Sequence, residues 1–333
     1  MTVIKEVNLA VYKKNLETIV KTMAPTRVMA VVKADGYGHG MVETARAATE
    51  VGIPILGVLD VESGIELRKG GISTTAFAWL HSPSTDFATA IRADIELSAS
   101  NLLELNRIAL APGVAKVHLK LDSGLSRNGA SADEWPELVK RAVSLDKQGE
   151  IDLVAIWTHL SGTSLEVDRD SLAKFDAAAS QAEKLGFAGY RHAAASPASF
   201  AIPESRYELV RIGVSAFGTS PIDGRSAESF GLSSPMSLKA SVLSPGVISI
   251  GFLHGYFSQL AGKASVLING NHYSVEQIGP LASKIEVGEY QPGDEVFVFG
   301  GSAIPAEEIC ALVGTVTDEL FTGIKANSVT YSN

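Results

Sequence analysis

Short apolar runs alternate with longer amphipathic segments over the first two thirds of the chain. The apolar runs predict eight strands, at residues 27–33, 54–60, 75–80, 93–98, 117–122, 153–159, 190–195 and 208–214. Helical periodicity between them predicts helices at 40–50, 61–70, 101–110, 132–147 and 168–186. Eight strands separated by helices favour a (β/α)₈ TIM-like barrel over an open doubly wound sheet, which usually has fewer strands.

The pattern changes after Pro221. A polar stretch with several Gly, Ser and Pro residues predicts a linker at 223–234. Beyond it the chain has short strand-like runs, including 310–316, without helical segments of similar length. We therefore predict an α/β protein in which residues 1–222 form a barrel and residues 235–333 form a small all-β C-terminal domain.

Composition excludes several classes of partner and compartment. The 333-residue chain has a formal net charge of −9, which argues against nucleic acid and against anionic membranes. Cys310 is the single cysteine, so no intrachain disulfide can form and a reducing compartment fits. The N-terminus lacks a secretory pattern, and no apolar run approaches the ~18 residues that span a bilayer. We expect a cytoplasmic protein that acts on a small molecule.

Reactive side chains recur where the predicted strands end. In a (β/α)₈ barrel the C-terminal strand ends form one rim, where the chemistry occurs. The residues at these ends or in the eighth strand are Lys33, Lys120, Arg127, His159, Ser196 and Arg211. Each alone has an ordinary structural explanation, but their shared rim predicts a single site.

The chemistry of this set points to a cofactor with a carbonyl and a phosphate. Nearby positive charge and desolvation lower the pKa of a lysine, and covalent chemistry with a carbonyl needs an unprotonated amine. Pyridoxal 5'-phosphate has an aldehyde, an aromatic ring and a dianionic group. We therefore predict this cofactor and no metal.

The stretch AVVKADGYGHG (30–40) resembles the cofactor-attachment signature of alanine racemases. The resemblance continues in order through VHLKLDSGLSRNG (117–129), WTHLSGT (157–163), HAAASPAS (192–199), LVRIGVSAFGTSP (209–221) and GDEVFVFG (293–300). It covers nearly the whole chain. It implies an isomerase that interconverts L- and D-alanine or a related amino acid, built as a head-to-tail homodimer of barrel and β domain.

The resemblance also implies a role for each matching residue. Lys33 would attach the cofactor and act as the base on one face of the substrate α-carbon. Arg127 would support the substrate carboxylate, positioned by Lys120, which is often carbamylated in the family. Arg211 would face the pyridine nitrogen and keep it unprotonated.

The remaining matches would hold the cofactor itself. Tyr37 would lie near the phosphate, which Ser196 and the backbone around Gly213 would bind. His159 would pack against the pyridine ring.

The chain is a divergent member by this resemblance, because the segment that carries the second base is missing. Racemisation needs a second proton-transfer group, which the family takes from a tyrosine of the partner subunit. Here residues 237–243 lead through only 244–246 into 247–256, with Phe252 and His254 in place of the family's tyrosine and aspartate. Further departures are Ala195 for asparagine, Pro280, Leu281 and Ala282 for Met-Asp-Gln, and Lys325 for a phosphate-contacting tyrosine.

Two hypotheses follow from these departures. The first is a racemase, with impaired activity or with Tyr256, His254 or Tyr273 as a replacement second base. The second is a non-racemising pyridoxal-phosphate-binding protein with a regulatory or other role. Inversion of configuration at the substrate α-carbon discriminates between them.

Overall fold

Eight parallel strands form a closed barrel in the computed structural model, which describes residues 2–333. The strands are β2 (Arg27–Val31), β3 (Ile55–Val58), β4 (Thr75–Ala78), β5 (Ile95–Ala99), β6 (Ala115–Lys120), β7 (Ile151–Trp157), β8 (Tyr190–His192) and β9 (Leu209–Ile212). They pair in the order β8-β7-β6-β5-β4-β3-β2-β9. The barrel closes between β8 and β9, where Arg211 N donates to Ala194 O at 3.0 Å. Each predicted strand overlaps an observed one, so the barrel prediction is confirmed.

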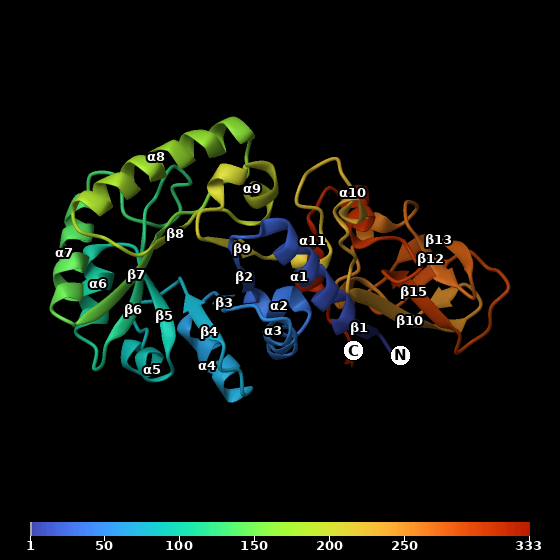
Figure 1. Cartoon of the computed structure of the whole chain (residues 1–333). Helices are drawn as coiled ribbons and strands as arrows, with labels where there is room; N and C mark the ends of the chain where they lie inside the picture. The colour runs from blue at the N-terminus through green and yellow to red at the C-terminus, as the bar shows by residue number, and fades with distance from the viewer. Residues whose placement is uncertain (1) are drawn as a thin grey trace.

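Helices follow most of the strands on the outside of the barrel (Figure 1). All five predicted helices are present, as α3 (Met41–Glu50), α4 (Val61–Lys69), α6 (Leu102–Ala109), α7 (Trp135–Lys147) and α8 (Leu165–Lys184). The structure adds α1 (Leu9–Met23), α5 (Phe87–Arg92) and α9 (Ser196–Ala201). Local capping fixes where helices begin: Asp60 Oδ1 accepts from Ser63 N at 2.8 Å, and Ser164 Oγ accepts from Val167 N at 3.2 Å.

A second sheet forms the C-terminal domain. Its strands are β10 (Met236–Ser244), β11 (Val247–Ile248), β12 (Ser265–Ile268), β13 (Asn271–Ile278), β14 (Ser283–Ile285), β15 (Glu295–Phe299), β16 (Ser328–Ser332) and the N-terminal β1 (Ile4–Asn8). They pair in the order β11-β14-β13-β12-β15-β10-β1-β16, and β11 also pairs with β10. The all-β prediction is confirmed for the strands.

Two details of this domain differ from the sequence-based expectation. Residues 4–8, which we assigned to the barrel, pair with β10 in the second sheet, in a register that places Ile4 opposite Lys239. Residues 310–316, predicted as a strand, lie mostly in helix α10 (Ala306–Val313), which ends at Gly314 with φ of 74° and is followed by α11 (Thr317–Gly323). The apolar run is buried on one helix face, which periodicity cannot distinguish from a strand over so few residues.

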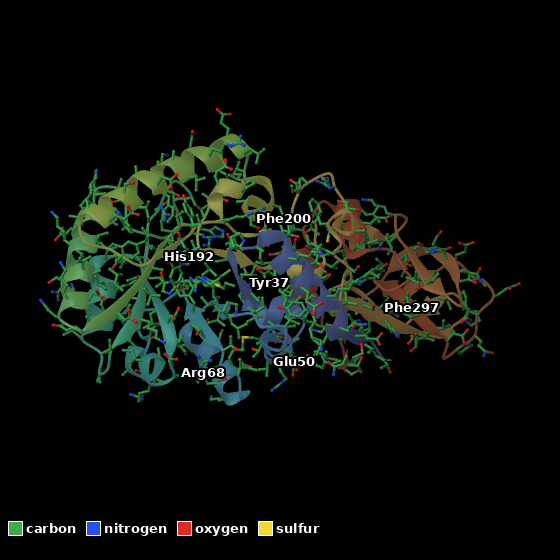
Figure 2. The ribbon with its side chains drawn as sticks, viewed as in Figure 1. Tyr37, Glu50, Arg68, His192, Phe200 and Phe297 are labelled. Carbon is green, nitrogen blue, oxygen red and sulfur yellow. The ribbon has the colours of Figure 1, made fainter. Side chains whose placement is uncertain are left out.

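The hydrophobic core extends from the barrel helices into the β domain. A separate small cluster of Met29, Ile55, Phe77, Trp157 and Leu209 fills the barrel interior. Figure 2 shows His192 among the side chains enclosed by the barrel and Tyr37 on the side toward the β domain. The N- and C-terminal strands lie beside each other, as Figure 1 shows. Across residues 2–333, no helix is long and apolar enough to cross a membrane.

Candidate active site

A cavity of about 440 Å³ lies at the C-terminal rim of the barrel strands. All eight residues selected from the sequence line it: Lys33, Tyr37, Lys120, Arg127, His159, Ser196, Arg211 and Gly213. The structure therefore brings together residues separated by up to 180 positions in the chain. It adds apolar and aromatic walls that the sequence did not indicate, among them Leu59, Trp79 and Trp157.

Lys33 lies in a tight turn rather than at the end of a strand. The strand β2 ends at Val31, and Lys33 opens the segment α2 (Lys33–Gly38). The four residues from Ala34 to Tyr37 have φ between 51° and 59° and ψ between 43° and 52°, a left-handed helical turn. This conformation costs roughly 1–2 kcal/mol for each L-residue, and such backbone strain clusters at functional sites.

Tyr37, Ser196 and Gly213 meet at one end of the cavity. The backbone N–H of Gly213 donates to Ser196 Oγ at 3.2 Å. A side chain at Gly213 would collide with the hydroxyl of Tyr37, so glycine is required here for the phenol to approach the backbone. The hydroxyl and backbone groups that the family resemblance assigns to the phosphate are thus adjacent, although they come from three separate segments.

The cavity has a strong excess of positive charge. Lys33, Lys120, Arg127 and Arg211 all line it, and none of the lining residues in the described chain is a carboxylate. The Lys120 ammonium lies 4.5 Å from the centre of the Trp157 ring. Burial, followed by the charges of Arg211 and Arg127, lowers the pKa of Lys120 to about 8. Such a site favours a ligand with more than one anionic group.

Arg211 is buried and makes a dense set of hydrogen bonds. Its Nη2 donates to Ala193 O at 2.8 Å and to Thr158 O at 3.0 Å. Its two terminal nitrogens also lie 3.1 Å from Nδ1 of His192 and of His159. Arginine has only donors, so both Nδ1 atoms accept and each neutral ring has its proton on Nε2. Burial lowers the pKa of Arg211 to about 9, which leaves it a cation at neutral pH.

The hydrogen-bond chain continues through the barrel interior. His192 Nε2 donates to His118 Nδ1 at 3.0 Å, and His118 Nε2 lies 2.9 Å from Glu96 Oε2. Sequence reasoning missed these three residues. They lie on different strands, and only the closed barrel turns their side chains toward one another.

The fold strongly lowers the pKa of three histidines, of which His39 and His192 are fully buried and His159 is partly buried at the cavity wall. Burial lowers the pKa of His159 to about 2 and that of His39 to about 3, and it lowers the pKa of His192 well below 6.5. For His159, the charges of Arg211 and Arg127 add to this effect. Unfolding exposes all three rings, whose ordinary pKa is about 6.5.

We therefore expect the free energy of unfolding to fall as the pH decreases below about 6.5. The unfolded chain then binds protons that the folded chain excludes, so the full stability is present above pH 6.5 and is lost toward pH 3. Each histidine contributes a slope of about 1.4 kcal/mol per pH unit to the free energy of unfolding. The three together contribute about 4 kcal/mol per pH unit. Urea unfolding between pH 7.5 and 5 measures this slope, and His39→Asn should reduce it by one proton. An equal slope in the variant and the wild type would contradict the assignment.

The comparisons with known proteins agree with this geometry. The model of the alanine racemase N-terminal domain matches residues 7–221, and that of the alanine racemase C-terminal domain matches residues 237–331. This chain belongs to the alanine racemase family. The alanine racemase of Salinispora tropica is 30% identical over 354 residues, covering 95% of this chain and 94% of that protein. That of Beutenbergia cavernae is 33% identical over 299 residues, covering 85% and 78%.

Solved alanine racemases share the whole fold. The enzyme from D-cycloserine-producing Streptomyces lavendulae has a TM-score of 0.94 at 29% identity and covers 100% of this chain and 97% of its own. The enzyme from Streptomyces coelicolor has a TM-score of 0.93 at 26% identity, with 100% and 98% covered. The alignment to the Salinispora alanine racemase is longer than the present chain, so that relative contains residues that this chain lacks.

The link between β10 and β11, where the family resemblance leads us to expect the second-base tyrosine, is a short hairpin. Strands β10 and β11 are joined directly through Pro245 and Gly246, with Ser244 paired to Val247 and Gly246 at φ of 76°. Proline and then glycine at positive φ form a two-residue turn. The turn leaves no loop on which a tyrosine could project.

The three candidates for a replacement base are buried within the β domain. The side chains of Tyr256, Tyr273 and His254 are 0%, 7% and 8% exposed, and none lines the cavity. Burial raises the pKa of Tyr256 far above its usual range. Lys325, which the resemblance aligns with a phosphate-contacting tyrosine, is exposed.

Proposed function

We propose that this chain is a pyridoxal-phosphate-dependent amino-acid racemase that interconverts L- and D-alanine or a closely related amino acid. The observation that carries the proposal is the cavity itself, which combines Lys33, the cluster of Tyr37, Ser196 and Gly213, and three further cations. Membership of the alanine racemase family, over both domains, supports the same activity.

The residues fit the cofactor in both shape and charge. Tyr37, Ser196 and the Gly213 backbone would hold the phosphate, Lys33 would attach the aldehyde carbon, and His159 would pack beside the ring. When bound, pyridoxal 5'-phosphate supplies an electron-withdrawing ring that acidifies the α-proton of an amino acid. A solved alanine racemase of Bartonella henselae, 20% identical, has covalently bound pyridoxal phosphate.

The chain's own side chains then handle the substrate and its protons. The amine of Lys33 takes or returns a proton on one face of the α-carbon. Arg127 binds the substrate carboxylate, and Lys120 lines the same cavity. Arg211 stays protonated, and its N–H groups donate to two histidines and two carbonyls. It therefore opposes protonation of a ring nitrogen placed against it.

A second candidate is a non-racemising pyridoxal-phosphate-binding protein. It is favoured by the Pro245–Gly246 turn and by the burial of Tyr256, Tyr273 and His254. One face of the α-carbon would then have no proton-transfer group from this chain, and Lys33 would act alone.

The assembly and the location are part of the same proposal. A head-to-tail homodimer would place each β domain at the other subunit's cavity. Phe252, Leu253 and Leu281 are 45%, 55% and 48% exposed on that domain, which supports an apolar contact there. The chain's single cysteine, Cys310, is unpaired, which supports a reducing compartment such as the cytoplasm.

Incubation of the cofactor-loaded protein with L-alanine and with D-alanine in heavy water tests the proposal. We expect α-deuterium incorporation together with inversion of configuration, which requires proton transfer on both faces. Deuterium with retention, or neither signal, would overturn the racemase proposal; retention alone would assign exchange to Lys33. A small panel of other amino acids identifies the preferred substrate, and protein reduced with borohydride before the assay is the control.

A further inference from the structure

The left-handed turn of residues 34–37 is contacted from outside by two side chains, neither of which lines the cavity. Three of its residues, Ala34, Asp35 and Tyr37, are not glycine, so each opposes this backbone conformation. The turn ends at Gly38: the carbonyls of Asp35 and Gly36 accept from the backbone N–H groups of Gly40 and His39, whereas those of Tyr37 and Gly38 accept from side chains. Neighbouring groups must therefore offset this conformational free energy and donate hydrogen bonds to these carbonyls, so that Lys33 and Tyr37 point into the cavity.

His39 binds the inner side of the turn. Its imidazole is fully buried, with Nδ1 3.1 Å from Gly36 O and 2.9 Å from Tyr37 O. Both partners are acceptors, so Nδ1 has the proton and donates to them. The ring lies between Phe217 and Phe321, at 4.5 and 4.9 Å between ring centres.

Lys5 binds the end of the turn from the other domain. It lies on β1, which pairs with β10 in the second sheet, and it is 7% exposed. Its ammonium donates to Gly38 O. Helix α11 packs on the same place, since a side chain at Gly38 would collide with the carbonyl of Phe321.

We infer that Lys5 and His39 are positioning residues that hold the turn of residues 34–37 in the conformation that directs Lys33 and Tyr37 into the cavity. The inference rests on the proposed function for the role of those two residues in cofactor binding. Because Lys5 belongs to the second sheet, the β domain sets the geometry of the barrel's attachment site within one chain. A charged donor on a buried carbonyl is among the stronger single hydrogen bonds in proteins.

Amide hydrogen exchange of the full chain without cofactor tests the holding role directly. In Lys5→Met and in His39→Leu we expect the amides of residues 36–41 to exchange roughly tenfold faster. His39→Asn keeps a donor near the Nδ1 position and should restore slow exchange. Lys239→Met is the matched control, since Lys239 lies on the neighbouring strand and binds Glu6 and Glu295 instead of the turn.

Cofactor affinity supplies the second readout. The ratio of the Kd for pyridoxal to that for pyridoxal 5'-phosphate should fall about tenfold in Lys5→Met and His39→Leu, because Tyr37 leaves the phosphate. Unchanged exchange at 36–41, or equal acceleration in peptides from β7, would overturn the inference. If exchange in the variants is faster only in the turn but the wild type binds no cofactor, the holding role is supported and the proposed function is rejected.

Discussion

We expect Lys33→Ala to abolish covalent attachment of pyridoxal phosphate and to lower racemisation by about 10³-fold or more, the scale on which removal of a covalent catalyst acts. Lys120 is the alternative site of covalent attachment, because it lines the same cavity. Its pKa of about 8 leaves a useful fraction of free amine at neutral pH. The two differ in place: Lys33 adjoins the turn that ends at Tyr37, whereas the ammonium of Lys120 lies over Trp157.

Borohydride reduction followed by peptide mapping decides between the two lysines. We expect the cofactor mass on the peptide that contains residue 33 in the wild type and in Lys120→Met, and on no peptide in Lys33→Ala. Visible absorbance of the bound cofactor should follow the same pattern. Cofactor fixed on residue 120 in the wild type would disprove the assignment.

We expect Arg211→Glu to lower racemisation by about 100-fold or more and to allow slow transamination, in which the amino group of alanine would pass to the cofactor and pyruvate would be released. A carboxylate against the ring nitrogen favours its protonation, whereas the guanidinium opposes it. Protonation strengthens the ring as an electron sink, and side reactions then compete with simple proton exchange. Coupled detection of pyruvate beside chiral analysis of alanine measures both effects.

The effect of Arg211→Glu on folding must be measured separately from its effect on catalysis. Arg211 donates to two histidines and two carbonyls inside the barrel, so its loss leaves buried acceptors unpaired. Arg211→Lys keeps the cation with fewer donors and should show a loss of racemisation without pyruvate. Pyruvate at wild-type level in Arg211→Glu, with a native circular dichroism spectrum, would contradict the role of the guanidinium.

The sequence predicted the parts of this protein that are encoded locally. A strand or helix of the barrel is specified by the spacing of its own apolar residues, and all eight strands and five helices were found within a few residues of their expected places. The residues at the strand ends could be selected as well, because the barrel fold itself dictates that these ends share a rim. The sequence also predicted a short link between residues 237–243 and 247–256, and the structure closes that hairpin through Pro245 and Gly246.

Contacts between distant segments required the tertiary structure. No periodicity could place residues 4–8 in the second sheet, since that depends on pairing with β10 more than 200 residues later. The left-handed turn after Lys33 opposes the intrinsic preference of its residues and exists because Lys5, His39 and Phe321 surround it. The same is true of the chain from Glu96 through His118 and His192 to Arg211, and of the burial of Tyr256, Tyr273 and His254. Which elements form and which reactive groups reach the rim could be predicted from the chain, because both follow from local patterns and strand order. The protonation, burial and strain of these groups could not, because each depends on neighbours that are remote along the chain.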